Sequence, residues 1–170
     1  FLTWDWMHLF FKEDTDKFLF KHLAGSLAFL PYGALVDHFQ HWVYENPTST
    51  PKERKKQWLN LEKIYQPDKN YDDLHFLKNG GLWQKQAHIY QMPFYYIDYT
   101  LAQICAFQFW IKMRENKDEA WKDYLNLCKA GGSMSFLDLV KLANIKSPFD
   151  PNVLKDVSLK INKWLDENSL

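Results

Sequence analysis

One histidine and four tyrosines fall within twelve residues near the middle of the chain: His88, Tyr90, Tyr95, Tyr96 and Tyr99. A phenol beside a developing oxyanion donates a neutral, directional hydrogen bond, and several phenols on one face can line a cleft. An imidazole just before them can bond a substrate carbonyl or amide. This group of side chains is therefore the chain's strongest candidate for a site that binds a polar substrate.

A helix is expected to position these groups. Pro93 suits the first helical position, because its missing N–H would be unpaired there anyway, and residues 94–111 contain no helix breaker. At about 100° per residue, the polar side chains share one stripe: Tyr95, Tyr96, Tyr99 and Gln103. The rest of the circumference is apolar, which is typical of a buried helix. The stripe therefore faces either a cleft or an internal polar network, and composition alone favours the internal network.

Metal sites are the main competing chemistry, because the chain has six histidines. A zinc peptidase helix needs the sequence H-E-x-x-H, and no His-Glu pair occurs in the chain. Four residues at helical spacing could share one face: Asp37, His38, His41 and Glu45. We interpret them as solvated or hydrogen-bonded groups, with a metal site as the alternative. Asp5-x-x-His8 and Asp72-x-x-His75 fit a di-iron bundle poorly. We therefore assign no metal ligand in this chain.

Composition narrows the class of protein. Lysine plus arginine equals aspartate plus glutamate at 21 each, so no net charge attracts nucleic acid or an anionic membrane. The apolar stretch from residue 94 to 111 contains Asp98, Gln103 and Gln108, so it is a poor membrane span. Cys105 and Cys128 form no spacing pattern and are interpreted as reduced thiols of a cytoplasmic protein. The length suits one domain, residues 1–170.

Helical patterns follow one another with no strand alternation, which predicts an all-α fold, a multi-helix array or bundle. Thr50-Pro51-Lys52-Glu53 is a capping box that starts a helix ending near Tyr65. Pro31 is expected to kink or restart the long helix before it. The remaining predicted helices span residues 16–44, 74–79, 94–111, 118–130, 136–143 and 151 onward.

The order of the residues from His88 to Tyr99, His-Ile-Tyr-x-x-Pro-Phe-Tyr-Tyr-x-x-Tyr, resembles the oligoendopeptidase F family of zinc metallopeptidases, relatives of thimet oligopeptidase. The segment from Gly33 to Pro47 is similar to another segment of that family. The resemblance spans essentially the whole chain, in the order of the family's C-terminal part. It implies that residues 1–170 are a helical C-terminal part of a larger zincin-type catalytic domain.

The family holds zinc with an H-E-x-x-H helix and a further glutamate, so the resemblance implies zinc ligands upstream of Phe1, absent from this chain. The uncapped start at Phe1 fits a chain that begins downstream of them. The implied partners are an oligopeptide substrate and the N-terminal part of the same parent protein, in the cytoplasm. The parent is then a zinc-dependent oligoendopeptidase, and this chain alone is expected to be inactive.

By motif position the resemblance makes His88 the substrate-binding histidine and Tyr99 the oxyanion donor. Tyr96 is the second candidate for that donor, and Tyr95 shapes the wall of the site. The sequence leaves open whether Tyr95 or Tyr96 faces the cleft. The alternative function is a free-standing helical interaction or scaffold domain without catalytic activity, which the eight tryptophans would suit.

Overall fold

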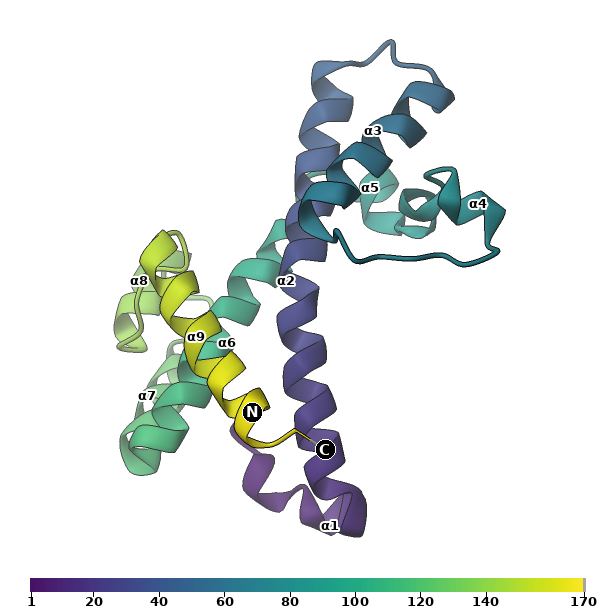
Figure 1. Cartoon of the computed structure of the whole chain (residues 1–170). Helices are drawn as coiled ribbons and strands as arrows, with labels where there is room; N and C mark the ends of the chain where they lie inside the picture. Colours follow the sequence, from purple (N-terminus) through teal and green to yellow (C-terminus); the bar gives the residue numbers. More distant parts are fainter. Residues whose placement is uncertain (170) are drawn as a thin grey trace. The chain divides into compact units, whose positions relative to one another are not determined.

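The computed structural model describes residues 1–169, which fold into helices with no strand among them. The all-α prediction is confirmed. The two longest helices are α2 (Thr15–Glu45) and α6 (Ile97–Glu115) (Figure 1). The other elements are η1 (Trp4–Trp6), α1 (His8–Phe11), η2 (Lys12–Asp14), α3 (Pro51–Tyr65), α4 (His75–Lys78), η3 (Leu82–Lys85), α5 (Ala87–Gln91), α7 (Lys117–Ala130), α8 (Phe136–Leu142) and α9 (Pro151–Glu167).

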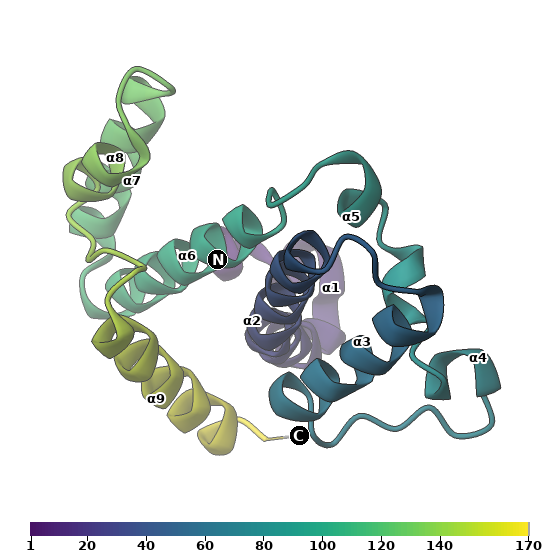
Figure 2. The same ribbon diagram turned by 90° about the horizontal axis from the view of Figure 1, so that it is seen from above.

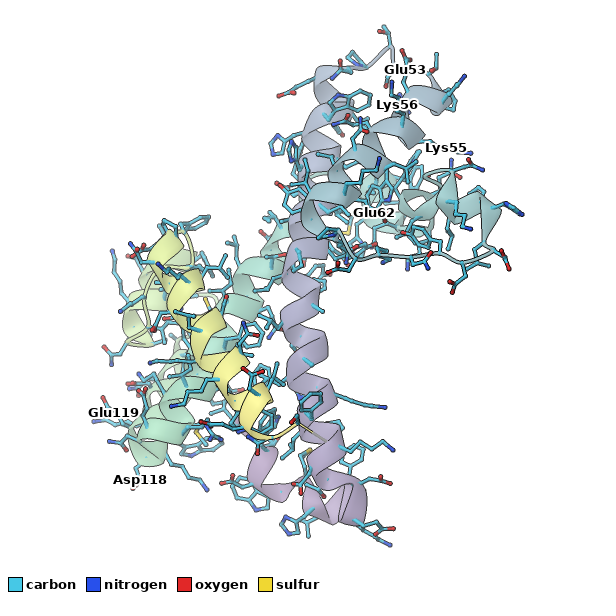
Figure 3. All side chains as sticks on the ribbon, in the orientation of Figure 1. Glu53, Lys55, Lys56, Glu62, Asp118 and Glu119 are labelled. Atoms are coloured by element: carbon cyan, nitrogen blue, oxygen red, sulfur yellow. The ribbon has the colours of Figure 1, made fainter. Side chains whose placement is uncertain are left out.

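Helix starts follow the capping signals of the sequence. At α3 the Thr50 hydroxyl accepts from the Glu53 N–H at 3.3 Å, and Glu53 Oε2 accepts from the Thr50 N–H at 2.7 Å. At α7 the Asn116 side chain accepts from the N–H of Glu119. Figure 3 labels Glu53 at the start of α3, and Asp118 and Glu119 at the start of α7. Carboxylates in a first turn also interact favourably with the helix dipole.

The described chain packs into two compact units, residues 1–27 with 101–169 and residues 28–100. Helices α2 and α6 each contribute to both units. The single domain expected over residues 1–170 stays a prediction. Helix α2 runs through Pro31 as one element, so the predicted restart of the helix at this proline is wrong.

The unit of residues 28–100 has its own apolar core. Figures 1 and 2 both show α3 beside the later part of α2. Side chains of α2, α3 and η3 form this core: Leu35, Val36, Phe39, Trp58, Leu61, Leu82 and Trp83. Glu62 of α3, labelled in Figure 3, is buried beside it and accepts hydrogen bonds from Trp58 Nε1 at 3.2 Å and from the Tyr71 hydroxyl. A buried carboxylate with two such donors is compatible with the core.

Helices α2 and α6 approach closely at Gly33. A Cβ atom at Gly33 would lie 2.0 Å from the Thr100 hydroxyl oxygen, closer than atoms can approach. Thr100 directly follows Tyr99, so this contact sets the position of the first turn of α6. The glycine therefore helps to position the tyrosine segment.

Replacing Gly33 by alanine is expected to lower the free energy of unfolding by about 1–3 kcal/mol, because the added methyl group forces Thr100 away. Gly25→Ala is the matched control, since a Cβ at Gly25 of the same helix meets nothing within 4 Å. That change should be neutral or stabilise the helix by up to about 1 kcal/mol. Urea unfolding measures both variants, and equal effects would show that the close approach does not constrain α6.

The unit of residues 1–27 and 101–169 is held by apolar helix faces and one polar cluster. Figures 1 and 2 show α7 and α8 side by side. Val153, Val157 and Ile161 of α9 are buried at a spacing of four residues, which places them on one face. The polar cluster joins α6, α7 and the turn after α8. There Lys112 Nζ bonds the buried Asp123 carboxylate, and Asn144 Nδ2 donates to the same carboxylate at 2.9 Å.

One stretch, Trp4–Glu45, has the length and apolar composition of a membrane-crossing helix, with a mean hydropathy of 1.3 in its most apolar window. Of that window, 28% is buried inside the structure. The core helix of a soluble protein or a signal sequence can have the same length and composition, so the stretch by itself assigns no membrane.

Candidate active site

The tyrosine segment begins with a turn. The predicted helix start at Phe94 is wrong, because α6 starts at Ile97. Phe94 has a φ of 60°, in the left-handed region that bulky residues rarely adopt and that no α-helix contains. Its ring lies 4.7 Å from the ring of His41 and 4.9 Å from that of Tyr44, contacts that accompany this backbone conformation.

Tyr95 and Tyr96 therefore precede the helix instead of lying on its surface. The Tyr95 N–H bonds the Met92 carbonyl at 3.2 Å, and the Asp98 N–H bonds the Tyr95 carbonyl at 3.1 Å. These two bonds close the turn and lead into the first turn of α6. The predicted helical stripe is wrong for these two residues, although their rings still lie beside that of Tyr99, at 5.4 and 5.5 Å.

His88 lies on α5, a short helix that the sequence analysis did not predict. Its imidazole centroid is 5.1 Å from the ring of Tyr96, 5.7 Å from that of Tyr99 and 6.4 Å from that of Tyr95. The structure thus brings the four proposed site residues together within residues 28–100. Tyr90, the remaining tyrosine of the motif, stacks instead on Trp83 at 5.7 Å.

The phenols of this cluster differ in their exposure. Tyr99 is 43% exposed and Tyr95 is 40% exposed, whereas Tyr96 and His88 are half-buried. Tyr96 packs against α2, with its ring 6.0 Å from both Phe29 and Tyr32. The Tyr95 and Tyr99 rings therefore face solvent, which disfavours the internal polar network that composition alone suggested.

The Tyr99 hydroxyl and His88 Nε2 are 3.5 Å apart, too far for a strong hydrogen bond. An oxygen atom placed between them can be about 2.8–2.9 Å from both. Loss of water contact and then the nearby Tyr95 phenol raise the pKa of Tyr99. Partial burial and then Tyr99 raise the pKa of Tyr96. Both hydroxyls therefore keep their protons at neutral pH and can act as donors.

Two residues that the sequence analysis did not identify lie directly behind His88. The Gln86 side-chain amide nitrogen is 2.8 Å from His88 Nδ1, and the Tyr32 hydroxyl donates to Gln86 Oε1 at 2.9 Å. Burial and then the nearby Tyr96 and Glu62 raise the pKa of Tyr32 to about 12. Tyr32 is 54 residues from Gln86 along the chain, so no local sequence signal could pair them.

The described residues do not fit a zinc site. No group of three or more histidine, cysteine, aspartate or glutamate side chains among them could hold a metal ion. Of the four spaced residues on α2, His41 Nε2 lies 3.5 Å from Asp37 Oδ2, and His38 Nδ1 is bonded to the Tyr65 hydroxyl at 3.0 Å. Both histidines thus contact neighbouring side chains, and the interpretation of the four residues as solvated or hydrogen-bonded groups stays a prediction.

The family model and the solved structures similar to this chain agree on one family. The model of peptidase family M3 matches residues 10–159. A solved structure of PZ peptidase A with an inhibitor is 57% identical, with a TM-score of 0.95 over 98% of this chain and 30% of that one. An X-ray structure described as an oligoendopeptidase F is 55% identical, with a TM-score of 0.94 over 99% of this chain and 30% of that one.

A third structure, described as an oligoendopeptidase F from Bacillus anthracis str. Ames, is 51% identical, with a TM-score of 0.81. It aligns with 100% of this chain and 28% of its own length. The chain thus spans less than a third of each of these solved proteins. No match was found among curated proteins.

Proposed function

Because the chain belongs to peptidase family M3, we propose that it forms the substrate-binding and oxyanion-stabilising part of a zinc-dependent endopeptidase that cleaves short oligopeptides. One observation carries this proposal: His88 Nε2 and the Tyr99 hydroxyl lie 3.5 Å apart, and the Tyr99 side chain is exposed to solvent. Two polar groups at this separation suit one peptide carbonyl oxygen. The resemblance of the His88–Tyr99 motif to oligoendopeptidase F supports the same substrate class.

Each residue of the cluster has a distinct proposed role. Tyr99 donates a hydrogen bond to the carbonyl oxygen as negative charge develops on it during attack on the peptide bond. His88 binds the substrate backbone and contributes a second polar contact to that oxygen. Tyr96, half-buried with its ring 5.5 Å from that of Tyr99, supports the Tyr99 ring and is the second candidate donor. Tyr95 forms the exposed wall.

These four residues are not proposed as zinc ligands, since no group of metal-binding side chains is found among the described residues. We propose that the zinc ligands lie in the family segments that this chain does not cover. The chain then works with the N-terminal part of the same parent protein, in the cytoplasm, as the helical C-terminal part of the catalytic domain. By itself it should bind no zinc and cleave no peptide.

Metal removal tests this assignment. The parent protein that includes this chain should cleave an internally quenched oligopeptide, lose this activity on treatment with a chelator, and regain it with added Zn²⁺. The 170-residue chain assayed alone with Zn²⁺ is the matched control and should show no turnover. Peptide cleavage that survives complete zinc removal, or zinc-dependent cleavage by the chain alone, would contradict the proposal.

A further inference from the structure

We infer that Gln86 and Tyr32 form a positioning relay that holds neutral His88 in the tautomer with its proton on Nε2. The relay consists of the two bonds behind the imidazole, from Tyr32 to Gln86 at 2.9 Å and from Gln86 to His88 Nδ1 at 2.8 Å. The consequence for catalysis rests on the proposed function. The tautomer itself rests on these contacts and on the orientation of the Gln86 amide, which has Oε1 toward Tyr32 and Nε2 toward His88.

The direction of the relay follows from the orientation of the Gln86 amide, whose oxygen faces Tyr32 and whose nitrogen faces His88. A phenol with its proton in place donates to the amide oxygen, as the Tyr32 hydroxyl does to Gln86 Oε1. The raised pKa of Tyr32, about 12, keeps that proton on the phenol throughout the neutral range. With its oxygen bonded to Tyr32, Gln86 presents only its NH₂ group to His88.

An NH₂ group offers His88 a donor and no acceptor. Nδ1 must therefore accept, through its lone pair. A neutral imidazole carries one proton, which then resides on Nε2. The Nε2–H group is on the side of the Tyr99 hydroxyl, at 3.5 Å. His88 Nε2 therefore donates a hydrogen bond toward the proposed position of the substrate oxygen. In the other tautomer, the Nε2 lone pair would repel that oxygen.

The relay also ties this short helix to the core of its unit. Tyr32 belongs to α2, and its ring packs 6.4 Å from Trp58 and 6.0 Å from Tyr96. Gln86 immediately precedes α5, a helix of only five residues with no side-chain cap of its own. Tyr32 on the long helix α2 thus orients, through Gln86, the imidazole of His88 on the short helix α5. The two bonds hold the imidazole ring in one orientation before the substrate binds.

Nitrogen-15 NMR of the 170-residue chain tests the tautomer directly. Long-range ¹H–¹⁵N correlation at a pH where imidazoles are neutral should show a protonated Nε2 and an unprotonated Nδ1 for His88. A His88→Asn variant assigns the resonance, and His38 serves as an internal reference, since its Nδ1 bonds a different phenol. A protonated Nδ1 in the unmodified chain overturns the inference.

Gln86→Glu tests whether the relay sets the tautomer. A carboxylate keeps the shape of the amide but only accepts, so it requires a proton on His88 Nδ1, and the Nδ1 resonance should move to the protonated range. Gln84→Glu is the matched control: it adds the same charge two residues away on an exposed side chain and should leave the resonance unchanged. An unprotonated Nδ1 in Gln86→Glu would show that Gln86 does not position the proton.

The same two variants separate this inference from the proposed function. In the complete peptidase, Gln86→Glu should lower kcat about tenfold or more, and Gln84→Glu should not. If the NMR result holds and both variants keep full activity, the tautomer assignment stands and the catalytic role of His88 is wrong. If the NMR result fails, the relay is wrong whatever the activity.

Discussion

Replacing Tyr99 by phenylalanine is expected to lower kcat of the complete peptidase by about 10²–10³, the usual cost of losing one oxyanion donor. The variant removes only the hydroxyl. The ring contacts with Tyr95, Tyr96 and His88 stay in place. Because Tyr99 is 43% exposed, its hydroxyl contributes little to the core. Steady-state kinetics on an oligopeptide should therefore show the loss mainly in kcat, with the thermal unfolding midpoint unchanged.

Tyr90→Phe is the matched control for that experiment. Tyr90 belongs to the same motif and is 57% exposed, but its ring stacks on Trp83 and not on His88. Removing this hydroxyl should change kcat by less than the spread between repeated measurements. Equal kinetics for Tyr99→Phe and the unmodified enzyme would rule out Tyr99 as the oxyanion donor and leave Tyr96 as the candidate.

Replacing Asp123 by alanine is expected to reduce the free energy of unfolding by about 3–5 kcal/mol, because it leaves a lysine without its buried partner. The Asp123 side chain is 4% exposed, and that of Lys112 is 19% exposed. Lys112 Nζ also donates to the Asn144 carbonyl at 3.2 Å, so the cluster joins α6, α7 and the turn after α8. Urea unfolding measures the loss. Asp118→Ala, an exposed carboxylate on the same helix, should cost under about 1 kcal/mol.

The decrease in the free energy of unfolding caused by Asp123→Ala should depend on pH, and its sign follows from the pKa of Asp123. The hydrogen bond from Lys112, followed by that from Asn144, lowers the pKa of Asp123, with burial opposing them. A carboxylate with a lowered folded pKa stabilises the fold fully above its unfolded value, about 3.9, and this contribution disappears as pH falls through the folded pKa. The difference between the unmodified chain and Asp123→Ala should therefore shrink only in acid. A difference that stays constant down to the lowest pH would contradict the ion pair.

Much of the helical framework could be predicted because its signals are local. The capping box of Thr50 and Glu53 starts α3 where the sequence indicated. Helices α7 and α9, capped by Asn116 and Asp150, begin within one residue of the predicted starts at 118 and 151. These signals involve residues at most three positions apart, so the bonds that decide each helix start lie within a short stretch of the sequence.

The sequence predicted that His88, Tyr95, Tyr96 and Tyr99 lie together, as their rings do, but it did not predict their geometry. Pro93 favours a helix start by its own conformation, yet the left-handed backbone of Phe94 delays α6 to Ile97. The contacts of the Phe94 ring with His41 and Tyr44 come from a helix some 50 positions earlier in the chain. The relay from Tyr32 to Gln86 is equally non-local. Such contacts depend on tertiary packing, which no local pattern of residues encodes.

A double-mutant cycle on His88 and Tyr99 tests the central claim most directly, because the claim is that both contact one substrate oxygen. The kcat/KM of the complete peptidase would be measured for His88→Ala, Tyr99→Phe and the pair, with thermal unfolding as the check on folding. If they share that oxygen, the effects should be non-additive, with a coupling of about 0.5–3 kcal/mol. Strictly additive effects would show that the two side chains act on separate groups and would contradict the proposed site.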